Sequence, residues 1–206
     1  MKRALVTVAV LALVATALYS GGASAAKPRG LVGPVSDAQG NTLGSIRIVK
    51  TEDGKTSVKI KAAGLAPGFH GFHVHSVGIC DPAATDAGGS PSPFFTAGGH
   101  YNPVTTNTHG AHAGDMPPLL VAEDGTAWLK FVTDRFVPKD LMDADGSAIV
   151  LHAGPDNLAH VPAATATGGE RYHSHVDDVF GADTVTKATG DAGARYGCAV
   201  LERISS

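Results

Sequence analysis

Short segments in which hydrophobic and polar residues alternate recur along this chain of 206 residues, separated by turn signals. Residues 45–50 and 56–62 flank Glu52-Asp53-Gly54-Lys55, which predicts a β-hairpin with an Asp-Gly turn. A second hairpin is predicted from 119–121 to 126–133, and further strands at 31–36, 71–76, 148–152 and 196–203. No stretch has a convincing helical period. We therefore expect an all-β sandwich or barrel of about eight short strands.

Two stretches are too long to be tight turns. Residues 81–116 are rich in Gly, Pro, Thr and His, and residues 153–194 in Gly, Ala, Asp and His. Loops of this length on a rigid scaffold are usually functional. Charged residues make up only 17% of the chain, which excludes a coiled coil and a highly charged disordered chain. The formal net charge of −3 argues against non-specific binding of nucleic acid.

The N-terminus has the pattern of a signal peptide. Lys2 and Arg3 precede an apolar run, and Ala23-Ser24-Ala25 has the A-x-A form of a cleavage site. The apolar run is short for a membrane span, and an uncleaved anchor is the alternative. We expect residues 1–26 to be removed and residues 27–206 to form one exported domain, in the periplasm, the cell envelope or the medium, without stable membrane insertion. The mature chain would carry 14 positive and 19 negative side chains, a net charge of −5.

Cys80 and Cys198 are the only two cysteines of the sequence. An oxidising compartment outside the cytoplasm favours a disulfide between them, and two separate buried thiols are the alternative. In the chain-entropy description, a disulfide across so long a loop stabilises the fold by about 4–5 kcal/mol.

Ten histidines stand out, and two of them lie in a predicted strand. His73 and His75 are two positions apart, so they point to the same face with Cα atoms roughly 6.5–7 Å apart. They could bind one metal ion together, or they could be hydrogen-bonded surface histidines. His152 ends an apolar strand and Asp156 follows it. A structural histidine and a solvated acid are the alternatives there, unless the two side chains meet the other histidines in space.

The loop at 81–116 holds a denser group. His100, His109, His112 and Asp115 supply three nitrogens and one oxygen, a complete tetrahedral set for Zn²⁺. The alternative is a polar, histidine-rich loop that binds no metal. Because no free thiolate is expected, nitrogen- and oxygen-binding metals such as zinc or copper are favoured over iron–sulfur chemistry.

Five ordered segments resemble the copper–zinc superoxide dismutases, of the exported bacterial kind. They are PGFHGFHVH at 67–75, AGGHYNP at 97–103, HAGD at 112–115, IVLHAG at 149–154 and GDAGARYGCAV at 190–200. The resemblance implies a Greek-key β-sandwich, or flattened eight-stranded barrel, with two long functional loops. It also implies an enzyme that disproportionates superoxide to O₂ and H₂O₂ by Cu²⁺/Cu⁺ cycling, with a structural zinc that shares a bridging histidine.

Carried over residue by residue, the resemblance assigns copper to His73, His75, His100 and His152, and zinc to His100, His109, His112 and Asp115. His100 and Arg195 are the implied catalytic residues, with Arg195 attracting the superoxide anion. Asp156 matches the acid that links a copper-ligand and a zinc-ligand imidazole. Cys80 and Cys198 match the family's disulfide, and His70 matches a structural histidine.

The sequence departs from the family pattern in its loops. Only two residues separate His109 from His112, and the expanded second loop holds His160, His173 and His175, outside the ligand pattern. Of the loop's usual charged guides, Lys187 is the one weak match.

The rival hypothesis is a non-enzymatic copper- and zinc-binding protein on the same scaffold, which would not need Arg195. A copper-only dismutase would lack the zinc residues, and hydrolase motifs are missing. Monomer and homodimer both remain open.

Overall fold

The computed structural model describes residues 30–204, so the predicted signal segment lies outside the described residues. Its strands are β1 (Gly30–Asp37), β2 (Thr42–Lys50), β3 (Thr56–Ala62), β4 (Gly68–His70), β5 (Phe72–His75), β6 (Leu119–Val121), β7 (Ala127–Thr133), β8 (Ala148–His152), β9 (His173–Ser174), β10 (Val179–Phe180), β11 (Arg195–Val200) and β12 (Glu202–Arg203). Residues 30–204 also contain one α-helix, α1 (Thr184–Thr189), and two 3₁₀ turns, η1 (Phe95–Ala97) and η2 (Pro138–Leu141). Within the described residues no helix is long and apolar enough to cross a membrane.

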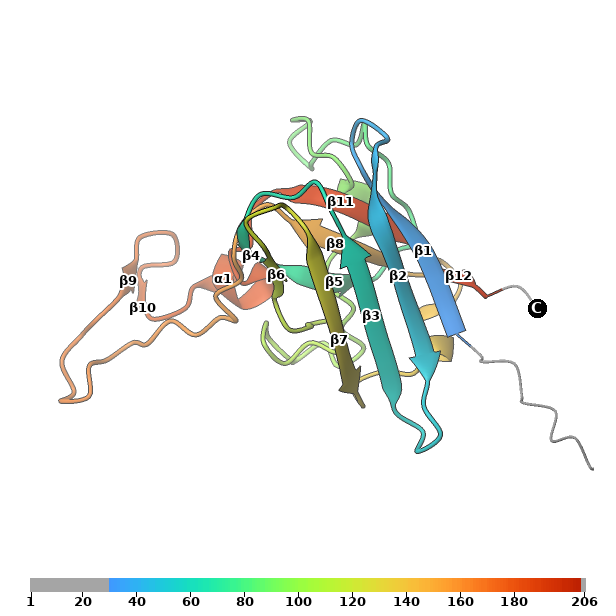
Figure 1. Ribbon diagram of the computed structural model, residues 1–206. Helices are drawn as coiled ribbons and strands as arrows, with labels where there is room; N and C mark the ends of the chain where they lie inside the picture. Colours follow the sequence, from blue (N-terminus) through green and yellow to red (C-terminus); the bar gives the residue numbers. More distant parts are fainter. Residues whose placement is uncertain (1–29, 205–206) are drawn as a thin grey trace, which may run out of the picture.

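The main sheet curls into a nearly closed barrel (Figure 1). Its strand order is β4-β6-β7-β3-β2-β1-β11-β8-β5, with β12 beside β1. The two ends of this order, β4 and β5, are consecutive in the chain and separated only by Gly71. The ten strands therefore correspond to eight, because β4 with β5 and β11 with β12 are two interrupted strands. The neighbours β3-β7-β6-β4 form a Greek key, so the predicted eight-stranded fold is confirmed.

Both predicted hairpins are present, and strand alternation separates core from surface. In the first, Ile46 is paired with Ile60 and Ile48 with Val58, all fully buried, whereas Arg47 between them is exposed. Alternation has a further consequence in β5. Phe72 and Val74 point into the main core, so His73 and His75 must point to the opposite face. That face is covered by the loops rather than by solvent, and both histidines are buried.

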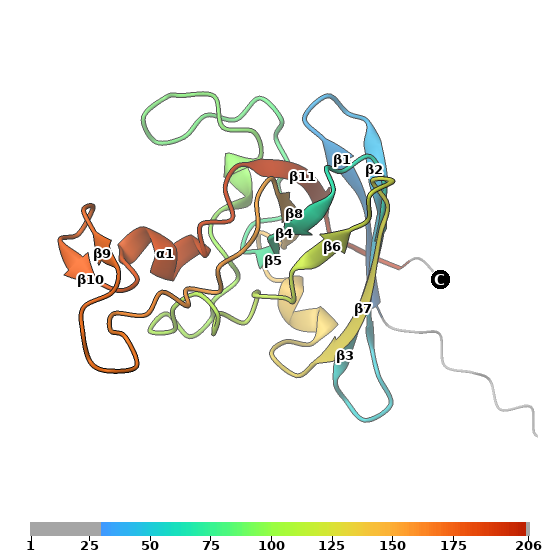
Figure 2. The same cartoon turned by 60° about the vertical axis from the view of Figure 1, so that its left-hand side comes forward.

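The expectation of no helix was wrong for residues 184–189. The Asp183 side chain accepts a hydrogen bond from the Thr186 backbone N–H (2.8 Å), and Gly190 ends the helix in the left-handed conformation. Six residues are too few for a helical period to appear in the sequence, although both caps are readable signals. Figure 1 and Figure 2 show α1 and the small β9–β10 hairpin on a lobe that projects from the barrel, away from β1–β3.

Candidate metal centre

Backbone pairing brings the histidine-rich segments together along β5. On one edge β5 pairs with β8, and on the other it runs beside the loop at 99–115, through bridges of His73 with Asp115 and of His75 with His100. The Val74 N–H donates to the Gly114 carbonyl (2.9 Å), and the Tyr101 N–H donates to the Val74 carbonyl (2.8 Å). These bonds hold β5 and the loop at 99–115 side by side, although the two are well separated in the sequence.

Three histidines, His73, His75 and His152, each use one ring nitrogen as a hydrogen-bond donor and leave the other without a partner. His75 donates from Nδ1 to the Gly98 carbonyl (2.8 Å), and His152 donates from Nδ1 to the Gly193 carbonyl (3.0 Å). His73 donates from Nε2 to Asp156 Oδ2 (2.6 Å). The second nitrogen of each ring therefore carries a lone pair. The free atoms are His75 Nε2, His152 Nε2 and His73 Nδ1.

Ligand atoms of two groups of side chains lie within 4.8 Å of one another. The first group consists of His73, His75, His100 and His152, and the second of His73, His100, His109 and Asp115. His100 belongs to both groups, because its ring lies between them, 4.0 Å from the His73 ring and 5.1 Å from the His109 ring. The sequence-predicted ligands thus converge in space, and His152 and Asp156 do meet the other histidines.

The orientation of the rings places His112 in the second group and His73 outside it. His112 Nδ1 lies 3.3 Å from Asp115 Oδ1, is buried and has no hydrogen-bond partner, so it faces the same point as His109 Nδ1, which is 3.1 Å from that oxygen. His73 is close by distance, but its Nε2 is occupied by Asp156 and its free Nδ1 belongs with the first group. By donor chemistry the second group is therefore His100, His109, His112 and Asp115.

Asp156 links the two groups from behind. Its Oδ2 accepts from His73 Nε2 and its Oδ1 accepts from His109 Nε2 (2.8 Å). Gly190 is the residue packed against this contact: a Cβ atom there would lie 2.3 Å from both Asp156 Oδ1 and His109 Nε2. The residue must therefore be glycine for steric as well as conformational reasons.

Burial and hydrogen bonding divide the side chains by charge. Burial lowers the pKa of His73 to about 4 in spite of its bond to Asp156, and burial together with the nearby His73 lowers the pKa of His152 to about 3. Both imidazoles are neutral at pH 7. Burial also opposes protonation of His109, but hydrogen bonds to Asp115 and Asp156 outweigh it and raise the pKa of His109 to about 9. The same bonds hold the pKa of both carboxyls well below their usual range, although burial would raise it.

Arg195 stands at the mouth of the first group. It donates from Nη1 to the Phe94 carbonyl (2.5 Å) and from Nη2 to the Gly98 carbonyl (2.6 Å), the same carbonyl that orients His75. Burial lowers the pKa of its guanidinium, which remains a cation at neutral pH. A cleft of about 470 Å³ opens here, lined by His75, His100, His152, Arg195 and, from the missed helix α1 and its C-terminal turn, Val185, Ala188, Thr189 and Asp191.

The remaining predicted residues lie elsewhere or play other parts. His70 directs both ring nitrogens to carbonyl oxygens, of His152 and Ala66, as a structural histidine does. His173 bonds to Asp178 in the β9–β10 hairpin, with the His175 ring 4.9 Å away, and neither of these two histidines belongs to the two groups above.

Lys187 is exposed on α1, where its backbone carbonyl accepts from the His109 N–H (2.6 Å). The predicted Cys80–Cys198 disulfide is present.

The chemistry of these donors fits two adjacent metal ions. Four buried imidazole nitrogens have no hydrogen-bond partner, namely His73 Nδ1, His75 Nε2, His152 Nε2 and His112 Nδ1. An unpaired buried polar atom costs about 1–3 kcal/mol, so these four are explained by metal ions that accept their lone pairs, three atoms in the first group and one in the second. The all-nitrogen group suits copper, and the three-nitrogen, one-oxygen group suits zinc.

A Greek-key barrel with two adjoining imidazole clusters under long loops defines a metal-binding β-barrel protein. The chain belongs to the copper/zinc superoxide dismutase (SODC) family, whose profile matches residues 42–201. The resemblance inferred from the sequence is therefore confirmed.

Named relatives support the assignment. The chain is 42% identical over 153 residues to the copper–zinc superoxide dismutase of Mycobacterium tuberculosis, covering 72% of this chain and 60% of that protein. It is 38% identical over 168 residues to the enzyme of Escherichia coli K12, covering 79% of this chain and 94% of the relative. The solved Cu/Zn superoxide dismutase from Brucella abortus, 26% identical, superposes with a TM-score of 0.57 over 83% of this chain and 98% of that one. The chain thus spans about 60% of the length of the mycobacterial relative.

Proposed function

We propose that this protein is an exported superoxide dismutase that converts two superoxide anions and two protons into O₂ and H₂O₂. The observation that carries the proposal is the convergence of His73, His75, His100 and His152, three of which keep an unpartnered buried ring nitrogen, beside a cleft lined by Arg195. His73, His75, His100 and His152 would hold copper, and His100, His109, His112 and Asp115 would hold zinc. Copper, when bound, supplies a one-electron Cu²⁺/Cu⁺ couple that superoxide can both reduce and oxidise.

The chain's own residues prepare the cleft for this reaction. Arg195 presents a fixed positive charge next to His75, held by two carbonyls, which favours entry of a small anion into a protein of negative net charge. Asp156 fixes the rings of His73 and His109 together, so that the two groups keep their spacing.

His100 is the residue placed to hold a proton. Its Nδ1 is turned to Asp115 Oδ1 (2.9 Å), so the ring is fixed from the zinc side and Nε2 is directed to the copper side. An imidazole nitrogen at that point can take up a proton and give it back to the reduced anion, while the ring stays in position.

Export is part of the proposal. The signal-peptide pattern of residues 1–26, with the mature domain at 27–206, and the Cys80–Cys198 disulfide support an oxidising location such as the periplasm, the cell envelope or the medium. N-terminal sequencing of the protein secreted or released from cells tests it, with a first residue near Lys27 as the expected result.

The decisive experiment measures superoxide dismutation and metal content in the same purified sample. We expect one copper and one zinc per chain, activity that is lost with His73→Ala, and zinc lost with Asp115→Asn while copper is kept. A fully metal-loaded protein without activity would contradict the proposal and favour the alternative of a non-enzymatic copper- and zinc-binding protein.

A further inference from the structure

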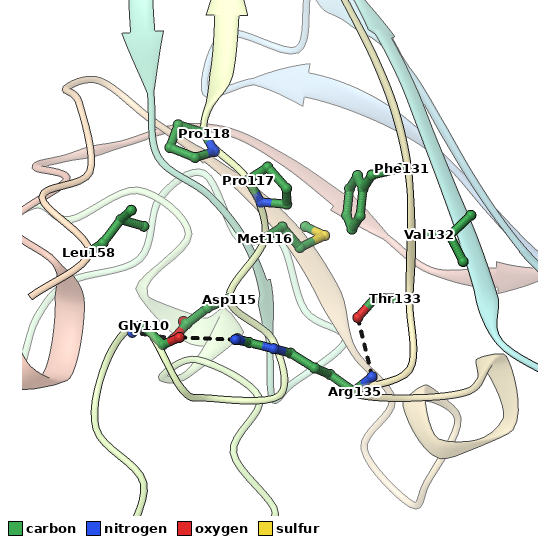
Figure 3. Close-up of a pocket in the computed structure, with 10 residues that line it drawn as sticks. All are labelled: Gly110, Asp115, Met116, Pro117, Pro118, Phe131, Val132, Thr133, Arg135 and Leu158. Carbon is green, nitrogen blue, oxygen red and sulfur yellow. Dashed lines mark hydrogen bonds between the residues drawn. The ribbon is translucent and has the colours of Figure 1, made fainter.

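The short turn between His109 and His112 is held from outside by one arginine. Arg135 donates from Nη2 to the Gly110 carbonyl (3.1 Å) and from Nη1 to the His112 carbonyl (3.1 Å). Figure 3 shows the side chain crossing from the end of β7 to the loop, beside Asp115. The two carbonyls belong to the residue after one proposed zinc ligand and to another proposed ligand itself.

The same two residues are bound on their other side by the carboxylate. Asp115 Oδ2 accepts from the Gly110 N–H (2.7 Å) and from the His112 N–H (2.9 Å). Its Oδ1 is thereby left to face the imidazoles. Gly110 and His112 are each fixed through the N–H by Asp115 and through the carbonyl by Arg135, so the orientation of the turn depends on both side chains.

Arg135 itself is anchored to the barrel. Its N–H donates to Thr133 Oγ1 (3.2 Å) at the end of β7. The next residue, Phe136, is buried in the main core, and its carbonyl accepts from Thr56 Oγ1 (2.6 Å). The guanidinium therefore connects a loop without regular structure to the rigid end of the sheet. A planar fork with two donors matches two neighbouring carbonyls, which a lysine ammonium cannot do.

Resting on the proposed zinc site, we infer that Arg135 is a positioning residue that sets zinc affinity by holding the 109–112 turn against the barrel. The turn has only two residues between its histidines, and Gly110 takes a positive φ of 88° with a Cβ position only 2.8 Å from the Leu158 carbonyl. Within the loop, the turn is held by the bond of the Ala111 N–H to the Thr108 carbonyl (2.9 Å) and by Asp115. The arginine connects the turn to the barrel through hydrogen bonds to Gly110 and His112, neither of which belongs to the proposed copper group.

The test compares Arg135→Ala and Arg135→Lys with the wild type and with Arg47→Ala, which removes an equal charge from an exposed position on β2. Zinc and copper dissociation constants are measured separately on the demetallated full chain by competition with a chelator. We expect zinc binding to weaken about tenfold in Arg135→Ala and less in Arg135→Lys, with copper binding unchanged. Co²⁺ placed in the zinc site should show an altered visible spectrum in Arg135→Ala.

A purely structural role would give other results. It predicts that Arg135→Ala lowers the melting temperature of the metal-free protein and weakens both metals alike, whereas we expect the metal-free melting temperature to match that of Arg47→Ala. Zinc affinity within twofold of the Arg47→Ala control would overturn the inference while leaving the proposed function intact. If Asp115→Asn binds zinc as tightly as the wild type, both the inference and the proposed zinc site are overturned.

Discussion

At the scale of single residues, the two ring nitrogens of each histidine in the copper group that donates a hydrogen bond have different roles. One nitrogen of each ring in His73, His75 and His152 donates a hydrogen bond, and the other is free to bind a metal ion. The tautomer of each ring is therefore fixed by the protein before a metal binds. The acceptors differ in a useful way. His75 and His152 bond to backbone carbonyls of the loops, whereas His73 bonds to a carboxylate that it shares with His109.

Gly190 gives the sharpest prediction at this scale. Gly190→Ala places a methyl group 2.3 Å from Asp156 Oδ1 and His109 Nε2, which breaks the contact between the two metal groups. We expect zinc affinity to fall at least about tenfold, and the free energy of unfolding to fall by about 2 kcal/mol. Zinc competition and urea unfolding measure the two effects.

Gly168→Ala is the matched control for that variant. Gly168 also has a positive φ, 88°, but a Cβ atom there meets nothing within 4 Å. Gly168→Ala therefore has the conformational cost of an alanine at positive φ, without the steric clash that a Cβ atom at residue 190 would cause. Equal losses in the two variants would show that backbone conformation alone, rather than the Asp156–His109 contact, is responsible.

The sequence predicted the candidate ligands but not what supports them. The spacing of His73 and His75 on a strand, and the density of donors at 100–115, follow from local rules that need no structure. Arg135 and Gly190 act on residues 25 and 81 positions away, respectively, and neither has a local pattern that separates it from an ordinary surface arginine or a helix-ending glycine. Such roles become visible only once the loops are placed.

At the scale of elements, the disulfide joins a ligand-bearing loop to the last long strand. Cys80 begins the segment that carries Phe94 and Gly98, whose carbonyls hold Arg195, and Cys198 lies on β11 three residues after that arginine. The covalent bond and the guanidinium thus fasten the same segment to the same strand.

Removing the disulfide should cost stability in the metal-free chain. For a closed loop of 118 residues, the double variant Cys80→Ser, Cys198→Ser should lose about 4–5 kcal/mol of unfolding free energy. Urea titration of the metal-free wild type with and without reductant should give the same difference. The double variant provides the control, since reductant should leave its midpoint unchanged; a shift there would mean that the reductant acts by another route.

The projecting hairpin should be dispensable for metal binding. Ala163 and Gly181 lie close together at its base, so residues 164–180 can be replaced by a short glycine linker. We expect the shortened protein to keep its copper and zinc content and activity within about threefold, because none of the clustered donors comes from this segment. Atomic absorption and the dismutation assay test this. Loss of one equivalent of metal would instead assign an accessory site to His173 and His175.

Strands were predicted better than the elements of the loops. The alternation in 45–50 and 56–62 yields a hairpin because the apolar residues of both strands face the core, although Thr56 and Ser57 of β3 are buried as well. The break at Gly71 and helix α1 escaped prediction for different reasons. The strand predicted at 71–76 covers β5 but not β4, because the three residues of β4 are too few for an alternation to appear. The helix is shorter than two helical turns.

At the scale of the whole molecule, charge opposes the proposed substrate. A net charge of −3, or −5 after removal of residues 1–26, repels an anion at long range, and Arg195 must offset this near the cleft. We expect Arg195→Ala to lower kcat/KM about tenfold at low ionic strength. The gap from the wild type should narrow as the Debye length shrinks from about 30 Å at 0.01 M salt to about 8 Å at 0.15 M. A gap independent of salt would mean that Arg195 acts by contact and not by attraction.

The pairing of β5 with β8 bears on the order in which the protein matures. The proposed copper residues come from β5, the 99–115 loop and β8, and they meet only after the chain has paired β5 with β8 across almost eighty residues. Three of the proposed zinc donors lie within residues 109–115 and are neighbours even in an unfolded chain. A refolding chain can therefore capture zinc early, at the entropic cost of a short loop. The copper residues come together only after β5 has paired with β8, so we expect copper to bind later in refolding than zinc.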